Sequence, residues 1–127
     1  MPLKLRTAFA HLWNSPNTLL GCVGALGGHW TWRRKEQICE VTGGWLTALL
    51  RRNRWADAIT LGDMVLYADG GIAPLLRAHE MVHVHQSRLW GPLFLPAYCL
   101  EALWQWLRTG DGYHNNRFER AAYDAPR

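Results

Sequence analysis

The chain has 127 residues and is 49% hydrophobic, which allows one globular domain with a modest core over residues 1–127. Its three cysteines are odd in number and scattered, so neither a disulfide framework nor a thiolate zinc site is indicated, and we expect free thiols in the cytoplasm. The net charge is +4, but the basic clusters at residues 33–35 and 51–54 belong to no nucleic-acid-binding module and are not interleaved with aromatic side chains. We therefore expect no nucleic-acid partner. An anionic membrane surface matches the excess positive charge better.

The N-terminal stretch predicts a helix but not a membrane span. Residues 1–13 begin like a signal peptide, yet polar residues 14–17 interrupt the apolar segment early, and no cleavage site follows. Ser15 and Pro16 predict the N-cap and the first residue of a short helix. The apolar run of residues 18–28 is too short and too rich in glycine to cross a bilayer.

Two hairpins and a short helix are predicted in the next part of the chain. Residues 30–42 place aromatic and β-branched residues on both sides of a charged turn, which favours a hairpin. Residues 45–52 have leucines on one helical face and basic residues opposite, which favours a short helix. Residues 56–69 alternate about a glycine-aspartate turn and predict a second hairpin. We expect residues 1–55 to form a helix-and-hairpin extension to a metal-site core at residues 56–127.

Residues 72–90 predict a buried helix that carries the motif HEMVH at residues 79–83. At about 100° per residue, His79 and His83 lie one turn apart on the same face, where two imidazoles can bind one divalent ion, most often Zn²⁺. Glu80 lies beside the first histidine and could take the proton of a water molecule that the metal activates. A solvated or hydrogen-bonded histidine pair is the alternative for so short a motif.

A catalytic zinc site needs a third protein ligand. The histidine of a metzincin would fall at Leu89, so that class is excluded. Glu119 falls in the first turns of a helix that an asparagine can cap, and Ala122 one turn later would let this helix pack closely against another. Glu119 is therefore the main candidate, and His114 is the rival third ligand. A solvated Glu119 that pairs with a neighbouring arginine is the remaining alternative.

The segment of residues 93–107 is strongly apolar and follows a chain break at Gly91 and Pro92. We expect a buried core helix. Its Glu101 and Gln105, and a length below about 20 residues, argue against a membrane span. The alternative is a helix that lies against a membrane or a partner, because tryptophans and arginines flank the segment as they flank membrane helices.

The motif at residues 79–83, followed by Gln86 and later by Glu119-x-x-Ala122 on a separate helix, resembles the small gluzincin-type metallopeptidases. The chain is particularly similar to their minimal, single-domain bacterial versions, over residues 56–123. The resemblance implies an α+β, zincin-like fold, in which a small antiparallel sheet packs on the HExxH helix and a second helix supplies a glutamate ligand.

The resemblance also implies roles for individual residues. His79, His83 and Glu119 would bind zinc, and Glu80 would act as the general base in the hydrolysis of a peptide or protein substrate. An edge strand of the second hairpin would pair with extended substrate.

The longer gluzincins have a helical subdomain that stabilises the oxyanion, and no such subdomain fits in this chain. Tyr113, His114 or Tyr123 could donate the required hydrogen bond instead, and Gln86 extends the histidine face by one turn. The small size also leaves a second hypothesis open. In it the chain is a non-catalytic binding or structural module that zinc stabilises, with peripheral membrane contact as a further alternative.

Overall fold

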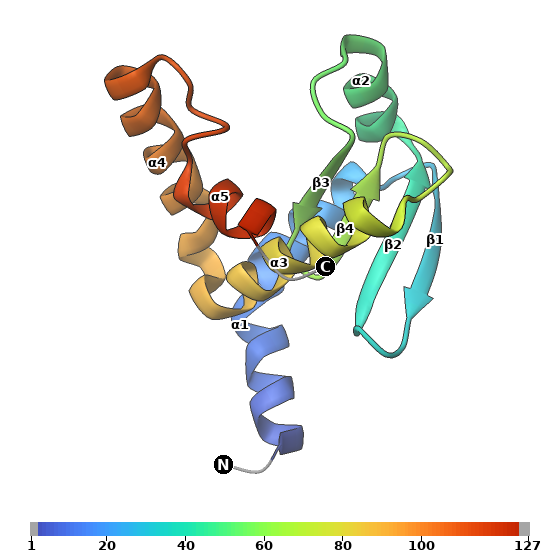
Figure 1. Cartoon of the computed structure of the whole chain (residues 1–127). Helices are drawn as coiled ribbons and strands as arrows, with labels where there is room; N and C mark the ends of the chain where they lie inside the picture. Colours follow the sequence, from blue (N-terminus) through green and yellow to red (C-terminus); the bar gives the residue numbers. More distant parts are fainter. Residues whose placement is uncertain (1–2, 125–127) are drawn as a thin grey trace.

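The computed structural model describes residues 3–124, so the ends of the predicted domain, residues 1–2 and 125–127, lie outside the described part. The described residues form an α+β fold in which helices accompany a small mixed sheet of four strands (Figure 1). In chain order the elements are α1 (Leu3–Gly24), β1 (Gly28–Arg33), β2 (Ile38–Gly43), α2 (Trp45–Asn53), β3 (Ala58–Leu61), β4 (Met64–Tyr67), α3 (Pro74–Trp90), the 3₁₀ turn η1 (Gly91–Leu93), α4 (Phe94–Thr109) and α5 (Arg117–Asp124).

The strands lie in the order β1-β2-β4-β3. β1 pairs with β2, and β3 with β4, in antiparallel fashion, so both predicted hairpins are confirmed. The prediction of an entirely antiparallel sheet is wrong, because β2 and β4 are parallel. The connection explains the difference: the chain leaves β2, passes through α2 and β3, and returns beside β2 in the same direction, which only a crossover allows. The residues before 56 thus supply two of the four strands.

Alternate side chains of β4 enter two hydrophobic clusters on opposite faces of the sheet. Met64 and Leu66 pack with residues of α1 and α2. Val65 and Tyr67 pack with Val84 and other residues of α3. A strand covered on both faces requires a continuous apolar sequence, and all four residues of β4 are buried. The helix that carries the two histidines is therefore fixed against the sheet.

α1 runs without interruption through Pro16, so the prediction of a short helix that starts at Ser15 is wrong. A proline has no N–H to donate to the carbonyl four residues earlier, which here belongs to Leu12. The hydroxyl of Ser15 donates a hydrogen bond of 2.7 Å to this carbonyl and replaces the missing backbone bond. The helix can therefore continue past the proline.

The helices predicted at residues 45–52 and 72–90 are confirmed as α2 and α3. Pro74 occupies the first turn of α3, where a missing N–H costs nothing. Gly91 ends α3 with a φ of 58°, and a Cβ at this position would overlap the ring of Trp13. The turn at Gly91 therefore needs glycine both for its conformation and for its contact with α1.

The prediction that residues 93–107 form a buried core helix is wrong in its burial. The segment is helical, as α4, but within it only Phe94 and Gln105 are buried. The helix leaves the sheet region and rises beside α5, as Figure 1 shows. Its Leu100, Leu103 and Leu107 are each more than half exposed. Within residues 3–124, none of the helices combines the length and the apolar character needed to cross a bilayer.

Candidate metal centre

The two histidines of the motif share one face of α3. His79 and His83 are one turn apart, and their ring centroids are 5.0 Å apart in an edge-to-face arrangement. His83 is buried and His79 is partly buried. The apolar positions of α3 that pack under the sheet, among them Val84, turn the histidine face toward α5.

Glu119 reaches this face from α5. The side-chain oxygen of Asn116 accepts a hydrogen bond of 2.9 Å from the backbone N–H of Phe118 and caps the helix start. Asn116 is fully buried and its amide also donates to the carbonyl of Tyr98, which fixes the start of α5 against α4. Ala122, one turn after Glu119, is buried. Its small side chain allows the close approach of α5 to α3 that the sequence predicted.

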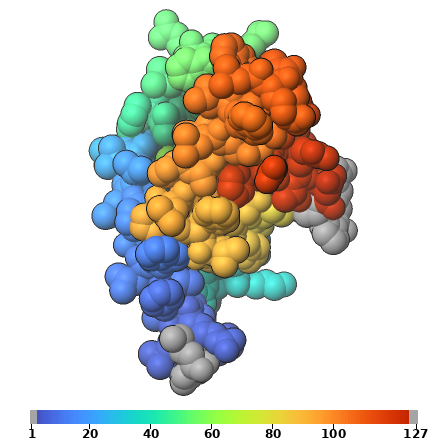
Figure 2. Space-filling view, turned by 90° about the vertical axis from the view of Figure 1, so that its left-hand side faces the viewer, coloured from blue at the N-terminus to red at the C-terminus, as the bar shows by residue number. Residues whose placement is uncertain are grey.

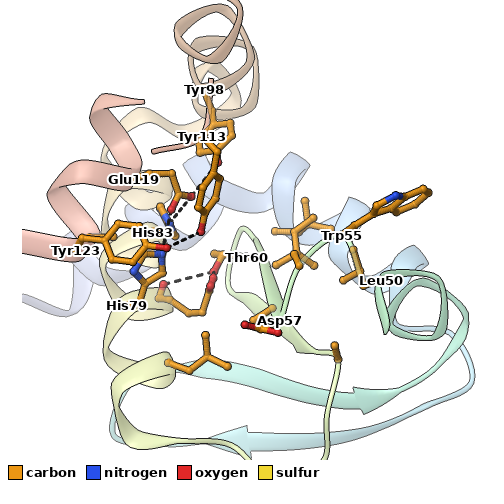
Figure 3. Close-up of a pocket in the computed structure, with 18 of the residues that line it drawn as sticks. Leu50, Trp55, Asp57, Thr60, His79, His83, Tyr98, Tyr113, Glu119 and Tyr123 are labelled. Carbon is orange, nitrogen blue, oxygen red and sulfur yellow. Dashed lines mark hydrogen bonds and ion pairs between the residues drawn. The ribbon is translucent and has the colours of Figure 1, made fainter. Parts of the chain in front are cut away.

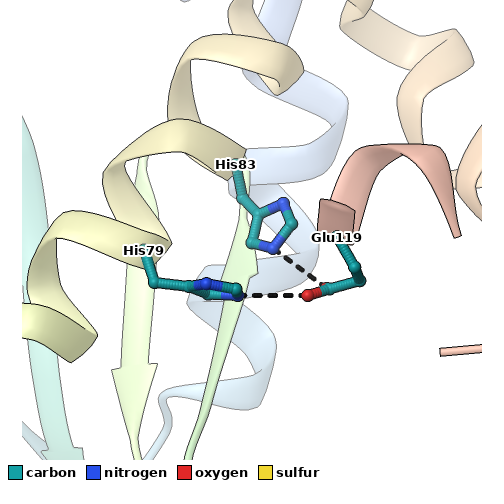
Figure 4. Close-up of side chains that lie close together, drawn as sticks. All are labelled: His79, His83 and Glu119. Carbon is teal, nitrogen blue, oxygen red and sulfur yellow. Dashed lines mark hydrogen bonds and ion pairs between the residues drawn. The ribbon is translucent and has the colours of Figure 1, made fainter. Parts of the chain in front are cut away.

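The three side chains converge, as Figure 4 shows. One oxygen of Glu119 lies 3.1 Å from Nε2 of His79, and the other lies 2.9 Å from Nε2 of His83. Their donor atoms all lie within 4.8 Å of one another. His79, His83 and Glu119 thus form a group close enough to bind one metal ion.

The state of His83 fits a metal ligand. Its Nδ1 lies 2.9 Å from the side-chain oxygen of Gln86, which can only accept, so Nδ1 carries the hydrogen. The amide of Gln86 is oriented by its own donation to the carbonyl of Phe118 at 3.0 Å. In this tautomer the buried Nε2 has a free lone pair, and its contact of 2.9 Å with the Glu119 carboxylate lacks the geometry of a hydrogen bond. A buried nitrogen of this kind calls for a ligand that accepts its lone pair.

Charges and burial oppose each other at Glu119. Burial raises the pKa of its carboxyl, but the neighbouring His83 imidazole and the hydroxyl of Tyr98, which donates a hydrogen bond of 2.8 Å, outweigh burial and lower this pKa. Burial lowers the pKa of His83, yet the carboxylate of Glu119 outweighs it and raises the pKa. The pair therefore holds a negative carboxylate at the centre of the group.

Glu80 lies on the same helix but does not belong to the ligand group. It is buried, and the hydroxyl of Thr60 on β3 donates a hydrogen bond of 2.6 Å to its Oε2. Burial raises the pKa of the Glu80 carboxyl, and Thr60 and the two histidines offset this only in part. The opposite oxygen, Oε1, has no hydrogen-bond partner among the described side chains.

A cleft of about 1290 Å³ opens onto these residues. Its walls come from β3, α3, α4 and α5 and from the segment that follows α2, and Figure 3 shows the ligand group at one end of it. Tyr113 and Tyr123 line the cleft, with hydroxyls 3.0 Å apart, and the ring of Tyr123 lies 4.5 Å from that of His79. β3 is an edge strand of the sheet and contributes all four of its residues to the lining.

Of the residues predicted to lie around the ligands, some lie beside the ligand group and one does not. Gln86, Tyr113 and Tyr123 lie beside the group. His114 does not: it is exposed and pairs with Asp111 at 2.9 Å, so it cannot take the place of Glu119 as third ligand.

Sequence reasoning missed Thr60 and Tyr98, which hold the two carboxylates. Thr60 is a polar residue between Ile59 and Leu61 in a short strand, which is a weak sign of an inward-facing hydroxyl. Tyr98 lies in an apolar helix, and nothing in the sequence pairs it with a glutamate 21 residues later.

Comparisons of the chain with protein-family models, with curated proteins and with solved structures found no match. The resemblance to gluzincins therefore depends on the residues of the motif and on the geometry described above.

Proposed function

We propose that this protein is a zinc-dependent metallopeptidase with a zincin-like core. The observation that carries the proposal is the convergence of His79, His83 and Glu119 from two helices, with the Nε2 atoms of the histidines 3.1 and 2.9 Å from the two carboxylate oxygens. Two imidazoles and one carboxylate are the protein ligands of a common class of catalytic zinc site. Zinc is also the divalent ion that this nitrogen-rich donor set favours over magnesium or calcium.

A zinc ion held by these three residues would polarise the scissile carbonyl and make a nearby water molecule more acidic. Side chains of the protein would carry out the proton transfers. Glu80 would take the proton of the attacking water through its free Oε1 and pass it to the leaving amine. Thr60 would hold the opposite oxygen and so keep the free one directed at the cleft.

Substrate binding is assigned to the cleft and its edge strand. β3 pairs with β4 along one edge only, and an extended peptide can add to the open edge through backbone hydrogen bonds. The hydroxyls of Tyr113 and Tyr123 lie on the opposite wall. Either one is a candidate donor to the oxyanion that develops on the substrate.

The test compares Glu80→Gln with the wild type. We expect the variant to bind zinc with unchanged stoichiometry, measured by elemental analysis, and to lose at least 100-fold in the cleavage of a quenched-fluorescence peptide library. Glu36→Gln, a change in the β1–β2 turn, is the matched control and should cleave like the wild type. Wild-type cleavage rates in the Glu80→Gln variant would reject the mechanism.

A non-catalytic module is the second candidate, and α5 supports it. This helix is short and buries only Glu119 and Ala122, so a metal bond would strengthen its attachment to α3 beyond the hydrogen bond from Gln86 to the carbonyl of Phe118. In that case metal would stabilise the fold and no peptide would be cleaved. A zinc-dependent rise in melting temperature without cleavage of any library peptide favours the module, and cleavage that requires zinc favours the peptidase.

A further inference from the structure

α4 has its polar and apolar sides reversed relative to a helix of a water-soluble domain. Its outer side consists of large apolar residues, each more than half exposed: Leu93 at the preceding turn, Leu100, Leu103, Trp104 and Leu107. Its polar residues lie on the inner side, where Gln105 is buried and bonds to both Glu101 and Arg108. Exposure of these side chains to water is unfavourable, and a contiguous exposed apolar patch normally marks an interface.

α1 is reversed in the same way. Its buried side carries Asn14 and Asn17, which bond to each other and to Ser87 on α3. The opposite side is apolar and exposed over the length of the helix, through Leu5, Phe9, Leu12, Leu19, Leu20 and Val23. At about 100° per residue these six positions lie within one stripe that faces away from the two asparagines.

The two apolar sides belong to one face of the molecule. The indole of Trp13 donates to the carbonyl of Leu89, and Asn17 donates to the carbonyl of Gly91, so α1 packs across the turn from which α4 starts. Figure 2 shows α1, this turn and α4 next to one another on that side. We call this surface the outer face.

Positive but no negative charge borders the outer face. No acidic residue occurs before Glu36, and the single acidic residue of α4, Glu101, points inward to Gln105. Lys4 and Arg6 are exposed and take part in no ion pair among the described residues.

We infer that the outer face binds the surface of an anionic lipid bilayer, with α1 and α4 lying at the boundary between headgroups and acyl chains. Exposed leucine and tryptophan would enter the boundary while lysine and arginine contact anionic headgroups, which is how interfacial helices bind. A second copy of the chain is a poorer occupant. A twofold contact through this face would bring its basic residues together with no acidic residue to compensate.

The test is co-flotation of the full chain with phosphatidylcholine vesicles that contain or lack phosphatidylglycerol, at low and high salt. We expect binding to the anionic vesicles at low salt, with a blue shift of tryptophan fluorescence, and much weaker binding to neutral vesicles. A wild-type chain that floats with neither vesicle overturns the inference. Self-association that the vesicles do not alter would overturn it as well, because the face would then bind another copy.

Substitutions test whether the outer face is the surface that binds the vesicles. Leu100→Gln with Leu103→Gln, and separately Lys4→Glu with Arg6→Glu, should each weaken binding to anionic vesicles by about tenfold or more. All four positions are exposed, so circular dichroism and zinc binding should stay unchanged. Trp32→Gln is the control: Trp32 is equally exposed but lies on β1, the sheet edge farthest from β3. Loss of binding in the control but not in the other variants would place the contact elsewhere and overturn the inference.

Discussion

The side-chain oxygen of Gln86 lies 2.9 Å from Nδ1 of His83, within one turn of the same helix. This contact fixes the imidazole in the tautomer whose Nε2 can bind a metal. Gln86 is itself held by the backbone of α5, through the carbonyl of Phe118. The contact therefore links the orientation of one ligand to the helix that supplies another, Glu119.

We expect Gln86→Ala to weaken zinc binding by 10- to 100-fold, in the range typical for loss of a group that orients a metal-bound histidine. His83 would lose its acceptor, and its ring could rotate or change tautomer. Competition with a chromophoric chelator measures the affinity. His85→Ala on the exposed side of α3 is the control and should bind zinc like the wild type. Equal affinity in the Gln86→Ala variant would show that the amide does not orient the ring.

Zinc should raise the melting temperature of the wild type and leave that of Glu119→Ala nearly unchanged. At a free zinc concentration about 100-fold above Kd, binding to the folded state alone adds about 2.7 kcal/mol to the free energy of unfolding. Glu119→Ala removes one of three ligands and the ion pairs that Glu119 makes with His79 and His83 across α5 and α3. Thermal melting with added zinc and with chelator measures the zinc-dependent shift in melting temperature of the wild type and of the variant. A wild-type melt that does not respond to chelator contradicts a metal-bound state.

Glu40 on β2 should make the fold sensitive to acid. Burial raises the pKa of its carboxyl, but two hydrogen bonds of 2.9 Å from Arg77 and one from the hydroxyl of Tyr67 outweigh burial, so the pKa is lowered. The unfolded chain then binds the proton more readily than the folded one. The stabilisation is therefore complete above the unfolded pKa and is lost as the pH falls through the folded pKa.

We expect Glu40→Gln to lower the free energy of unfolding by about 1.5–3 kcal/mol at neutral pH, the usual range for a hydrogen bond to a charged group. The difference from the wild type should shrink as the pH falls below about 4. Urea unfolding at a series of pH values measures it. Glu36→Gln, which removes a more exposed ion pair with Arg33, should leave the stability nearly unchanged. A constant difference at all pH values would mean that the charge of Glu40 contributes nothing.

Asn17 should be among the most sensitive positions of α1. Its amide donates to Asn14, Ser87 and the carbonyl of Gly91, all in a buried region. Asn17→Ala removes these three donations from a buried network and should cost about 1–3 kcal/mol, measured by urea unfolding. The matched control is Leu19→Ala on the exposed side of the helix, which we expect to stay within about 0.5 kcal/mol of the wild type. Similar costs for both substitutions would show that the network does not hold α1 in place.

Most helices and strands could be predicted from local patterns, because the hydrophobic period and the turn residues depend only on neighbouring positions in the sequence. Both hairpins, α2 and α3 follow from such patterns. The parallel pairing of β2 with β4 does not, since it depends on the path of the crossover rather than on either strand. The exposure of α4 could not be predicted either. An apolar segment has the same composition whether it is buried in the protein core or binds a membrane or a partner.

The candidate site, too, could be predicted only in part from the sequence. The histidine pair is visible in the sequence because one helix turn separates its members. Glu119 could be proposed only by its residue type and its helix, and the folded chain decides that it, rather than His114, meets the pair. The partners of the two carboxylates, Thr60 and Tyr98, come from other elements and have no pattern that links them to the motif.

The parallel contact between β2 and β4 has a consequence for the order of folding. Each hairpin joins strands that are adjacent in the chain, so it can form early and alone. Cys39, in contrast, pairs with Met64 across a segment of the chain that includes α2 and all of β3. Closing this loop costs chain entropy before any contact compensates it. We therefore expect the docking of one hairpin on the other to limit the folding rate, so that substitutions at Val41 or Leu66 slow folding more than they speed unfolding.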